Sequence, residues 1–236
     1  MTAPSDNGSR PRFHVLVGDH LEAAESIIAK YPNSRSAILP LLFLVQGIEG
    51  YVTNRGMREV GHLLGLTPAQ VLGSGSFYTM LKKRPQGTYL ISVCRNVSCR
   101  HRGAFKVIDA LEQRLGVEAG EITPDGTFEL ETAECLATCD GAPSLQINYE
   151  DFYDATPEGV VELVDRLARG ERVTSVRGEP VRTSKEVSYE TAVSGAVLPG
   201  TAGDHEARTI GGESPRADTA PGTRPKLDHD QEGHRG

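Results

Sequence analysis

The sequence has no long run of apolar residues. The longest apolar stretch extends from Ala37 to Val45 and is interrupted by Pro40, whereas a helix that spans a bilayer needs about 20 apolar residues. We therefore expect no direct membrane insertion. Residues Met1 to Pro11 are polar and lack the apolar core of a secretory signal, so we expect a cytoplasmic protein whose thiols stay reduced.

The sequence also has no excess of basic residues. It carries 25 Lys and Arg against 32 Asp and Glu, which gives a formal net charge of −7. A protein that binds nucleic acid needs a concentrated basic surface to meet the phosphate groups. We therefore expect no nucleic acid among its partners.

Apolar residues are scarce towards the C-terminal end. Only nine of the 66 residues in 171–236 are Leu, Ile, Val or Phe, below the roughly 20 % at which burial offsets chain entropy. We predict a disordered tail over 171–236 and a flexible N-terminus over 1–17. The chain is longer than one usual domain, and we divide the rest into a helical domain, 18–84, and a second domain, 85–170.

Residues with helical spacing and capping residues fill the first of these domains. We predict helices from Gly18 to Tyr31, from a cap at Ser34 or Ser36 through Gln46, from Asn54 to Leu64 and from Thr67 to Leu72. Leu21, Ala24 and Ile28 fall on one face of the first helix. The pattern predicts an N-terminal helical bundle.

The pattern changes after Thr88, where β-forming residues become frequent. Strands are predicted over Thr88–Val93, Thr127–Thr132 and Ser144–Tyr149. Helices are predicted from Cys99 to Gly116 and from Thr156 to Gly170. The order of strand, helix, two strands and helix predicts a compact α+β domain.

The chain has only four cysteines, and they form two closely spaced pairs. Four residues separate Cys94 from Cys99, and three separate Cys135 from Cys139. A 2Fe-2S cluster needs four thiolates, two for each iron, and short loops bring each pair together at low entropic cost. The spacing predicts one 2Fe-2S cluster on these residues. The first pair spans a predicted strand-to-helix turn, where the helix dipole would favour a thiolate at Cys99.

Other uses of four thiols fit this spacing less well. Zinc also takes four thiolates, but its two knuckles usually have similar spacing, so a zinc-stabilised interaction protein is an alternative. Disulfides are not expected in a reducing compartment. A thiol-disulfide catalyst normally has two residues between its cysteines. Redox-sensing or unligated thiols are a further alternative.

Charged residues lie close to the first cysteine pair in the sequence. His101 is expected to be a neighbour of the cluster, because a Rieske-like centre would use two histidines on one iron. Arg95, Arg100 and Arg102 flank it. They would either stabilise the reduced cluster, dock an acidic partner, or form a solvated face.

Several segments of the sequence resemble the small 2Fe-2S subunit of respiratory complex I. The resemblance extends over about Gly18 to Gly170. The segments that carry it are Cys94-Arg-Asn-Val-Ser-Cys99, Glu134-Cys135-Leu-Ala-Thr-Cys139-Asp-Gly-Ala-Pro143, Ser76-Phe-Tyr-Thr-Met80 and Pro85-Gln-Gly87.

This resemblance implies a helical N-terminal part followed by a thioredoxin-like ferredoxin domain, with Pro143 as a cis-proline beside the active loop. It implies that Cys94, Cys99, Cys135 and Cys139 bind the cluster. The chain would be an electron-transfer subunit of a proton-translocating NADH:quinone oxidoreductase. It would pair with the flavin-binding, NADH-oxidising subunit, which holds FMN and NADH, and with other peripheral-arm subunits. It would lie at the inner face of the cell membrane.

The same resemblance admits a related subunit of a soluble NAD-linked hydrogenase or formate dehydrogenase. The family usually has Gly-Ala where this chain has Ala137-Thr138. Ala137 therefore either avoids a left-handed backbone or adopts one at a cost of about 1 kcal/mol. Gly103 is expected to allow close packing on the sheet, and Phe77 and Tyr78 are expected in the core or in an interface.

Overall fold

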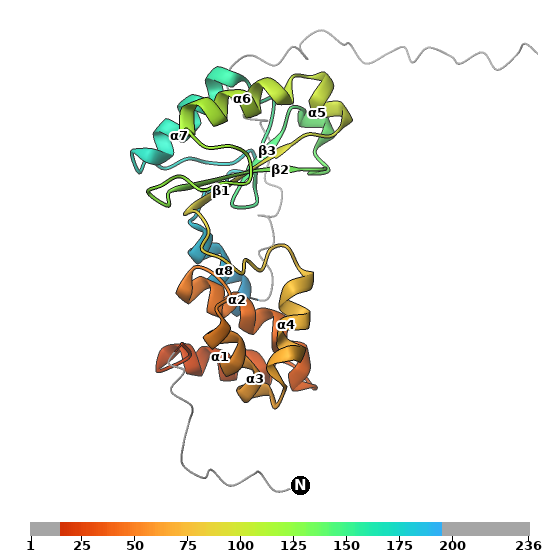
Figure 1. Ribbon diagram of the computed structural model, residues 1–236, viewed down its shortest axis with the longest axis vertical. Helices are drawn as coiled ribbons and strands as arrows, with labels where there is room; N and C mark the ends of the chain where they lie inside the picture. The colour runs from red at the N-terminus through yellow and green to blue at the C-terminus, as the bar shows by residue number, and fades with distance from the viewer. Residues whose placement is uncertain (1–14, 195–236) are drawn as a thin grey trace, which may run out of the picture.

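The computed structural model describes residues 15–194 of the 236-residue chain. A helical part lies at one end and a four-stranded sheet with its covering helices at the other (Figure 1). Most of the predicted flexible start, 1–17, lies outside the described residues. Its last residues contradict that prediction, because Val15 and Leu16 are buried in the helical core. The Val15 N–H also donates to the Glu59 carboxylate at 3.0 Å.

Four helices follow one another in the helical part. They are α1 (Asp19–Ala29), α2 (Ile38–Glu49, after a short 3-10 turn at Ser34–Ala37), α3 (Asn54–Leu64) and α4 (Pro68–Phe77). The Thr53 hydroxyl accepts the Gly56 N–H, and Thr67 forms a reciprocal capping box with Gln70. These caps explain why α3 and α4 begin where the sequence predicts. α4 continues to Phe77, beyond its predicted end at Leu72.

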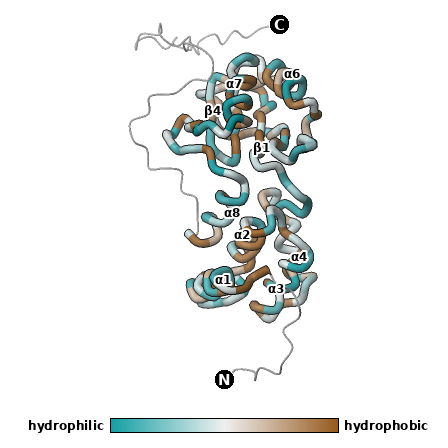
Figure 2. The backbone as a smooth tube through the Cα atoms, turned by 90° about the vertical axis from the view of Figure 1, so that its left-hand side faces the viewer, coloured by the Kyte–Doolittle hydropathy of each residue, from teal (hydrophilic) through white to brown (hydrophobic). Residues whose placement is uncertain are grey.

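The apolar run noted in the sequence forms the centre of the helical core. Leu41, Leu42, Leu44 and Val45 of α2 are fully buried, and Figure 2 shows hydrophobic residues along α2. Pro40 lies in the first turn of this helix, where its missing N–H costs no hydrogen bond. Within residues 15–194, no helix is both long and apolar enough to cross a bilayer.

The second part is built on a mixed sheet with the strand order β2-β1-β3-β4. The strands are β1 (Tyr89–Cys94), β2 (Phe128–Ala133), β3 (Leu145–Ile147) and β4 (Glu150–Phe152). β1 and β2 are parallel, and the other two pairs are antiparallel. The helices α5 (Val97–His101), α6 (Ala104–Leu115) and α7 (Pro157–Ala168) cover one face of this sheet (Figure 1).

Two elements of this domain differ from the sequence prediction. The single strand predicted over Ser144–Tyr149 is a hairpin, because Asn148 and Tyr149 take positive φ angles of 48° and 72° and turn the chain. The single helix predicted from Cys99 is divided into α5 and α6 at Gly103, which has φ 99°. A Cβ at Gly103 would have no atom within 4 Å, so its role is backbone freedom and not the close packing that we expected.

The disorder predicted over 171–236 is wrong for its first part. Residues 171–183 follow the sheet domain, and α8 (Ser184–Ser194) packs against α2 of the helical part (Figures 1 and 2). The composition of the tail did not predict this helix. The reason is that α2 supplies most of the apolar surface of the contact, and α8 adds only a few buried side chains such as Val187 and Ala192. The remaining residues, 195–236, lie outside the described part of the chain.

Two aromatic residues between the parts are exposed. Phe77 and Tyr78 are 78 % and 43 % exposed, and their rings contact each other edge to face at 5.0 Å between centroids. The core role considered for them is therefore wrong, and the interface role stays a prediction.

Candidate metal centre

The parallel pairing of β1 and β2 brings the two cysteine loops to the same edge of the sheet. Cys94 is the last residue of β1 and lies opposite Ala133, the last residue of β2. Cys99 follows on α5, and Cys135 follows β2 by two residues. Because parallel strands end at the same edge, residues far apart in the sequence become neighbours there.

The two cysteine pairs differ in burial. All four cysteines are free thiols, and Cys94 and Cys99 are only 3 % and 1 % exposed, whereas Cys135 and Cys139 are exposed. Leu136, from the loop between the second pair, packs against a small apolar cluster that contains both buried cysteines. The second loop therefore lies directly on the first.

Hydrogen bonds also join the two loops. The Thr138 hydroxyl donates to the Ser144 hydroxyl at 2.7 Å, and the Ser144 oxygen lies 3.6 Å from the Cys99 sulfur. The Cys94 thiol donates to the Glu134 carbonyl at 3.9 Å. These contacts bring groups from β1, α5 and the second loop around the same sulfur atoms.

The second loop has an unusual backbone at Ala137. Its φ is 60°, so this residue adopts the left-handed conformation that the family's glycine would permit. In this conformation the Ala137 N–H donates to the Cys135 sulfur at 3.4 Å. The left-handed backbone thus aims an amide at a candidate ligand.

Two further features shape the end of this loop. The peptide bond between Ala142 and Pro143 is cis, as the resemblance predicted. A Cβ at Gly141 would lie 2.2 Å from Cγ of Tyr153, so Tyr153 packs directly on the loop backbone. Only glycine fits this position without a shift of the loop or of Tyr153.

The three arginines near the first pair each have an intramolecular partner. Arg102 donates from Nε to the Ala142 carbonyl at 2.6 Å, and its Nη2 lies 3.8 Å from Oδ1 of Asp154. Arg95 forms an ion pair with Glu134 on the second loop. Arg100 lies over the ring of Phe105, 5.3 Å from its centroid, and His101 is exposed at the end of α5.

The pKa of Cys99 is raised by burial, and the neighbouring Cys94 raises it further, whereas hydrogen bonds with Ser144 act in the opposite direction. Cys99 is the third residue of the five-residue helix α5 and so lies in its first turn, and the expectation that the helix N-terminus favours its thiolate stays a prediction. A bound metal ion would instead favour the thiolate form of Cys99, since a coordinating thiol loses its proton.

The donor set suits an iron–sulfur cluster, because such clusters are held by cysteine thiolates. The structure brings Cys94 and Cys99 together and places Cys135 and Cys139 on the adjoining loop. Within residues 15–194 it gathers no three His, Cys, Asp or Glu side chains around one point where a metal ion could be held.

Sequence reasoning missed Ser144 as a site residue, and it did not predict the contacts that Thr138 and Arg102 make with Ser144 and Ala142. Ser144 lies 45 positions from Cys99, and Arg102 lies 40 positions from Ala142. No local spacing signal connects residues so far apart. The spacing of Cys135 and Cys139 and the motif ending at Pro143 pointed to the second loop but not to these contacts.

Comparison with known proteins identifies relatives over most of the described chain. Residues 24–168 match the family described as thioredoxin-like 2Fe-2S ferredoxin. A NADH-quinone oxidoreductase subunit of Mycobacterium tuberculosis is 44 % identical over 165 residues, which cover 70 % of this chain. The match spans 66 % of that protein, just under two thirds of its length.

A second relative and a solved structure are also similar to this chain. NADH-quinone oxidoreductase subunit 2 of Thermus thermophilus is 37 % identical over 161 residues, which cover 67 % of this chain and 89 % of that protein. The crystal structure of an air-oxidised NAD+-reducing NiFe-hydrogenase matches with a TM-score of 0.52 and 19 % identity, over 59 % of this chain and 24 % of that chain, which shows a shared fold alone. The chain belongs to the thioredoxin-like 2Fe-2S ferredoxin family.

Proposed function

We propose that this chain is an electron-transfer subunit that carries one 2Fe-2S cluster in the NADH dehydrogenase module of respiratory complex I. The observation that supports it most directly is the meeting of two cysteine loops at one edge of the sheet. Cys94 and Cys99 on the first loop, and Cys135 and Cys139 on the second, would each supply one thiolate ligand.

A 2Fe-2S cluster supplies a one-electron carrier when bound. The chain's own residues would hold it and control its surroundings. The Ala137 amide and the Ser144 hydroxyl lie within reach of Cys135 and Cys99, and hydrogen bonds to the sulfurs tune such a centre. Because Cys94 and Cys99 are buried, the exposed second loop is the side from which an electron would enter or leave.

The names of the relatives support a place in a larger assembly. The mycobacterial and Thermus proteins are named as subunits of NADH-quinone oxidoreductase. The partner would be the flavin-binding, NADH-oxidising subunit, with FMN and NADH bound there, and other peripheral-arm subunits would adjoin it. The chain would then act as a cytoplasmic, peripheral subunit at the inner face of the membrane.

The chain would consist of two domains, a helical bundle over 18–84 and the ferredoxin domain over 85–170. Two separate apolar clusters support the division, one around α2 and one between the sheet and the helices α6 and α7. Ala192 of α8 belongs to the first cluster, so the helical domain would also include the end of the described chain.

The cluster assignment is tested by analysing iron and acid-labile sulfide after anaerobic purification. We expect two iron ions and two sulfide ions per chain. A serine variant at each candidate ligand should lose most of its iron and sulfide, whereas His101→Ala should keep both. These variants are Cys94→Ser, Cys99→Ser, Cys135→Ser and Cys139→Ser. Full iron and sulfide in every serine variant would overturn the ligand set, and zinc without sulfide would favour the zinc-stabilised interaction protein.

The place in the electron path is tested with the flavin-binding subunit from the same cells. NADH should bleach the visible spectrum of the cluster when that subunit is present, and it should have no effect on the isolated chain. Rapid reduction of the isolated chain by NADH would contradict the proposal that the NADH site lies on the partner.

A second candidate is the corresponding subunit of a soluble NAD-linked hydrogenase or formate dehydrogenase. The fold similarity to a chain of the NAD+-reducing hydrogenase favours it. Proteins that copurify from the native cell decide between the two. Membrane-embedded quinone-reducing subunits support complex I, and a soluble hydrogenase or formate dehydrogenase subunit supports the second candidate.

A further inference from the structure

The chain connects its two parts twice. Residues 78–88 lead from α4 to β1, and residues 171–183 lead back from α7 to α8, which packs on α2 (Figure 1). The family match ends at residue 168, before this return. We propose that residues 171–194 form an interdomain strap that fixes β1, the strand that ends at Cys94, relative to the helical part.

The strap first binds the outer strand of the sheet. The Val176 N–H donates to the Asp151 carbonyl at 3.0 Å, and the Arg177 guanidinium lies 3.2 Å from the Asp151 carboxylate. Asp151 belongs to β4, which is the edge strand beside β3. The strap thus pairs the Asp151 carbonyl on an edge strand, where outward backbone groups have no neighbouring strand to bond.

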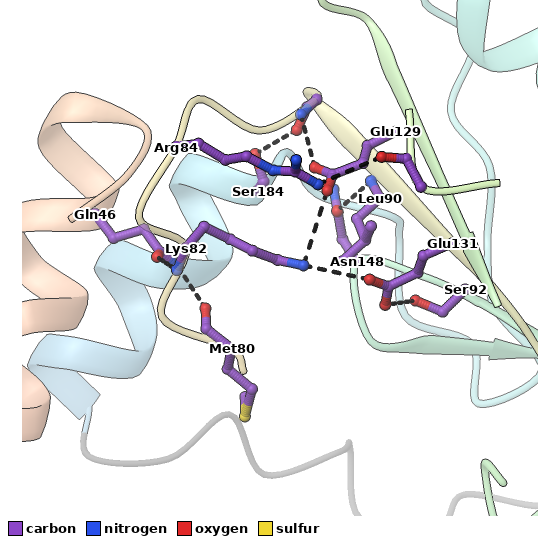
Figure 3. Close-up of polar contacts among 12 residues, drawn as sticks. Gln46, Met80, Lys82, Arg84, Leu90, Ser92, Glu129, Glu131, Asn148 and Ser184 are labelled. Carbon is purple, nitrogen blue, oxygen red and sulfur yellow. Dashed lines mark hydrogen bonds and ion pairs between the residues drawn. The ribbon is translucent and has the colours of Figure 1, made fainter. Parts of the chain in front are cut away.

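Asn148 then joins the strap to β1 through one buried amide. Figure 3 shows its contact with Leu90 of β1. Asn148 is 2 % exposed, and its Oδ1 accepts the Leu90 N–H at 2.8 Å. Its Nδ2 donates to the carbonyls of Thr88 at 2.9 Å and Arg182 at 2.7 Å. Since a buried polar group is costly when left unpaired, these three bonds hold the strap and the start of β1 in one arrangement.

The first residue of α8 repeats this connection. The Ser184 N–H donates to the Thr88 carbonyl at 2.9 Å, and the Ser184 hydroxyl donates to the Gly87 carbonyl at 2.9 Å. The Thr88 carbonyl therefore accepts from both Asn148 and Ser184. Both bonds act on the segment that enters the strand of Cys94.

The rest of the strap is attached to α2. The Gln46 side chain, 3 % exposed, donates from Nε2 to the Ser188 hydroxyl and to the Met80 carbonyl, both at 3.0 Å. A Cβ at Gly47 would lie 2.7 Å from the backbone nitrogen of Tyr189. The two helices therefore approach each other backbone to backbone at Gly47.

Two connections restrain a domain more than one does. Domains joined by a single linker and a modest interface move relative to each other by default. Here the chain returns and closes a loop through buried hydrogen bonds, so rotation about residues 78–88 would break them. The strap would have this effect whichever redox partner the chain serves.

The first test uses Gly47→Ala in the full chain loaded with its cluster, because the added methyl group must displace the backbone of α8. The matched control is Gly73→Ala on α4, where a Cβ would meet no atom within 4 Å. We expect hydrogen exchange to become about ten-fold faster or more over residues 184–194 and over 87–90, with α6 and the visible spectrum unchanged. The control should match the wild type at all of these amides.

The second variant leaves the contact between α2 and α8 intact. Asn148→Asp keeps the size of the side chain but places an oxygen against the carbonyls of Thr88 and Arg182. We expect faster exchange over residues 87–90 and 176–183 and a larger radius of gyration by X-ray scattering. The proposal is overturned if α8 is released in Gly47→Ala while exchange at 87–90 and the scattering stay unchanged. It is also overturned if residues 184–194 of the wild type exchange as fast as an unstructured peptide.

Discussion

Ala137 donates its backbone N–H to the sulfur of Cys135 at 3.4 Å, and it does so from a left-handed backbone with φ 60°. This conformation is strained for alanine, since its Cβ approaches the following carbonyl oxygen at a cost of roughly 1–2 kcal/mol. The chain therefore keeps an amide aimed at a candidate ligand although this lowers local stability.

Ala137→Gly should relieve that strain. The gain is partly offset by the greater chain entropy of glycine in the unfolded state, so we expect a net stabilisation of about 0.5–1 kcal/mol. The temperature at which the visible absorbance is lost should rise by about 2 °C. Ala137→Val should lower it, because a β-branched residue fits this backbone poorly. A glycine variant that is less stable than the wild type would show that the left-handed backbone is not strained.

Gly141→Ala should disturb the second cysteine loop. The added Cβ would lie 2.2 Å from Cγ and 2.6 Å from Cβ of Tyr153, which are atoms close to the backbone that cannot swing away. We expect a loss of roughly 1–3 kcal/mol, as for other overpacked sites, and faster loss of iron to a chelator. Gly141→Ala combined with Tyr153→Gly, which removes both of these clashing atoms, should recover part of the iron retention. Equal iron loss from the single and double variants would argue against this contact as the cause.

Lys82→Met should destabilise the junction between the two parts. Lys82 Nζ lies 3.9 Å from the carboxylate of Glu129, which is 4 % exposed, and 3.3 Å from that of Glu131 (Figure 3). Among the described residues, removing the lysine leaves the buried Glu129 carboxylate with the Gly87 N–H as its hydrogen-bond donor, at a cost of about 3 kcal/mol.

The matched control for Lys82→Met is its combination with Glu129→Gln, which removes the buried charge as well. Thermal melts of the two single variants and the double variant should show strong non-additivity, with the double variant close to the wild type. If the effects of the two substitutions simply add, Lys82 and Glu129 do not interact.

The turn before β2 should be sensitive to acid. Hydrogen bonds from Thr123 and Thr127 lower the pKa of Asp125 to about 2. The folded-state pKa is below the unfolded value near 4, so its contribution to stability is present above about pH 4 and is lost as the pH falls towards 2. By NMR at about pH 4, the Asp125 carboxyl carbon should report an ionised group.

The Thr123→Ala/Thr127→Ala double variant is the control for Asp125. Its Asp125 carboxyl should be more protonated than that of the wild type at the same pH, although the residue 127 N–H still donates to it. If the chemical shift of this carbon is the same in the wild type and the double variant, the two threonines do not lower the pKa of Asp125.

The starts of several helices were predictable because they depend on neighbours in the sequence. Thr53, Thr67 and Thr156 each cap a helix by accepting an N–H three residues ahead. The pairing of Cys94 with Cys99 is equally local, and so is that of Cys135 with Cys139. Such features depend on chain segments of a few residues, whose geometry varies little between proteins.

Other features depend on segments that meet only after folding. α8 was missed because its apolar partner, α2, is about 140 positions earlier in the chain, as the bond from Gln46 to Ser188 shows. The sequence by itself determined which residues could bind iron and where several helices begin. Only the tertiary structure decided that Cys94 and Cys99 are buried, that Ser144 lies beside Cys99, and that Asn148 joins the strap to β1. The reason is that burial and long-range hydrogen bonds depend on which surfaces meet, and spacing along the chain does not encode this.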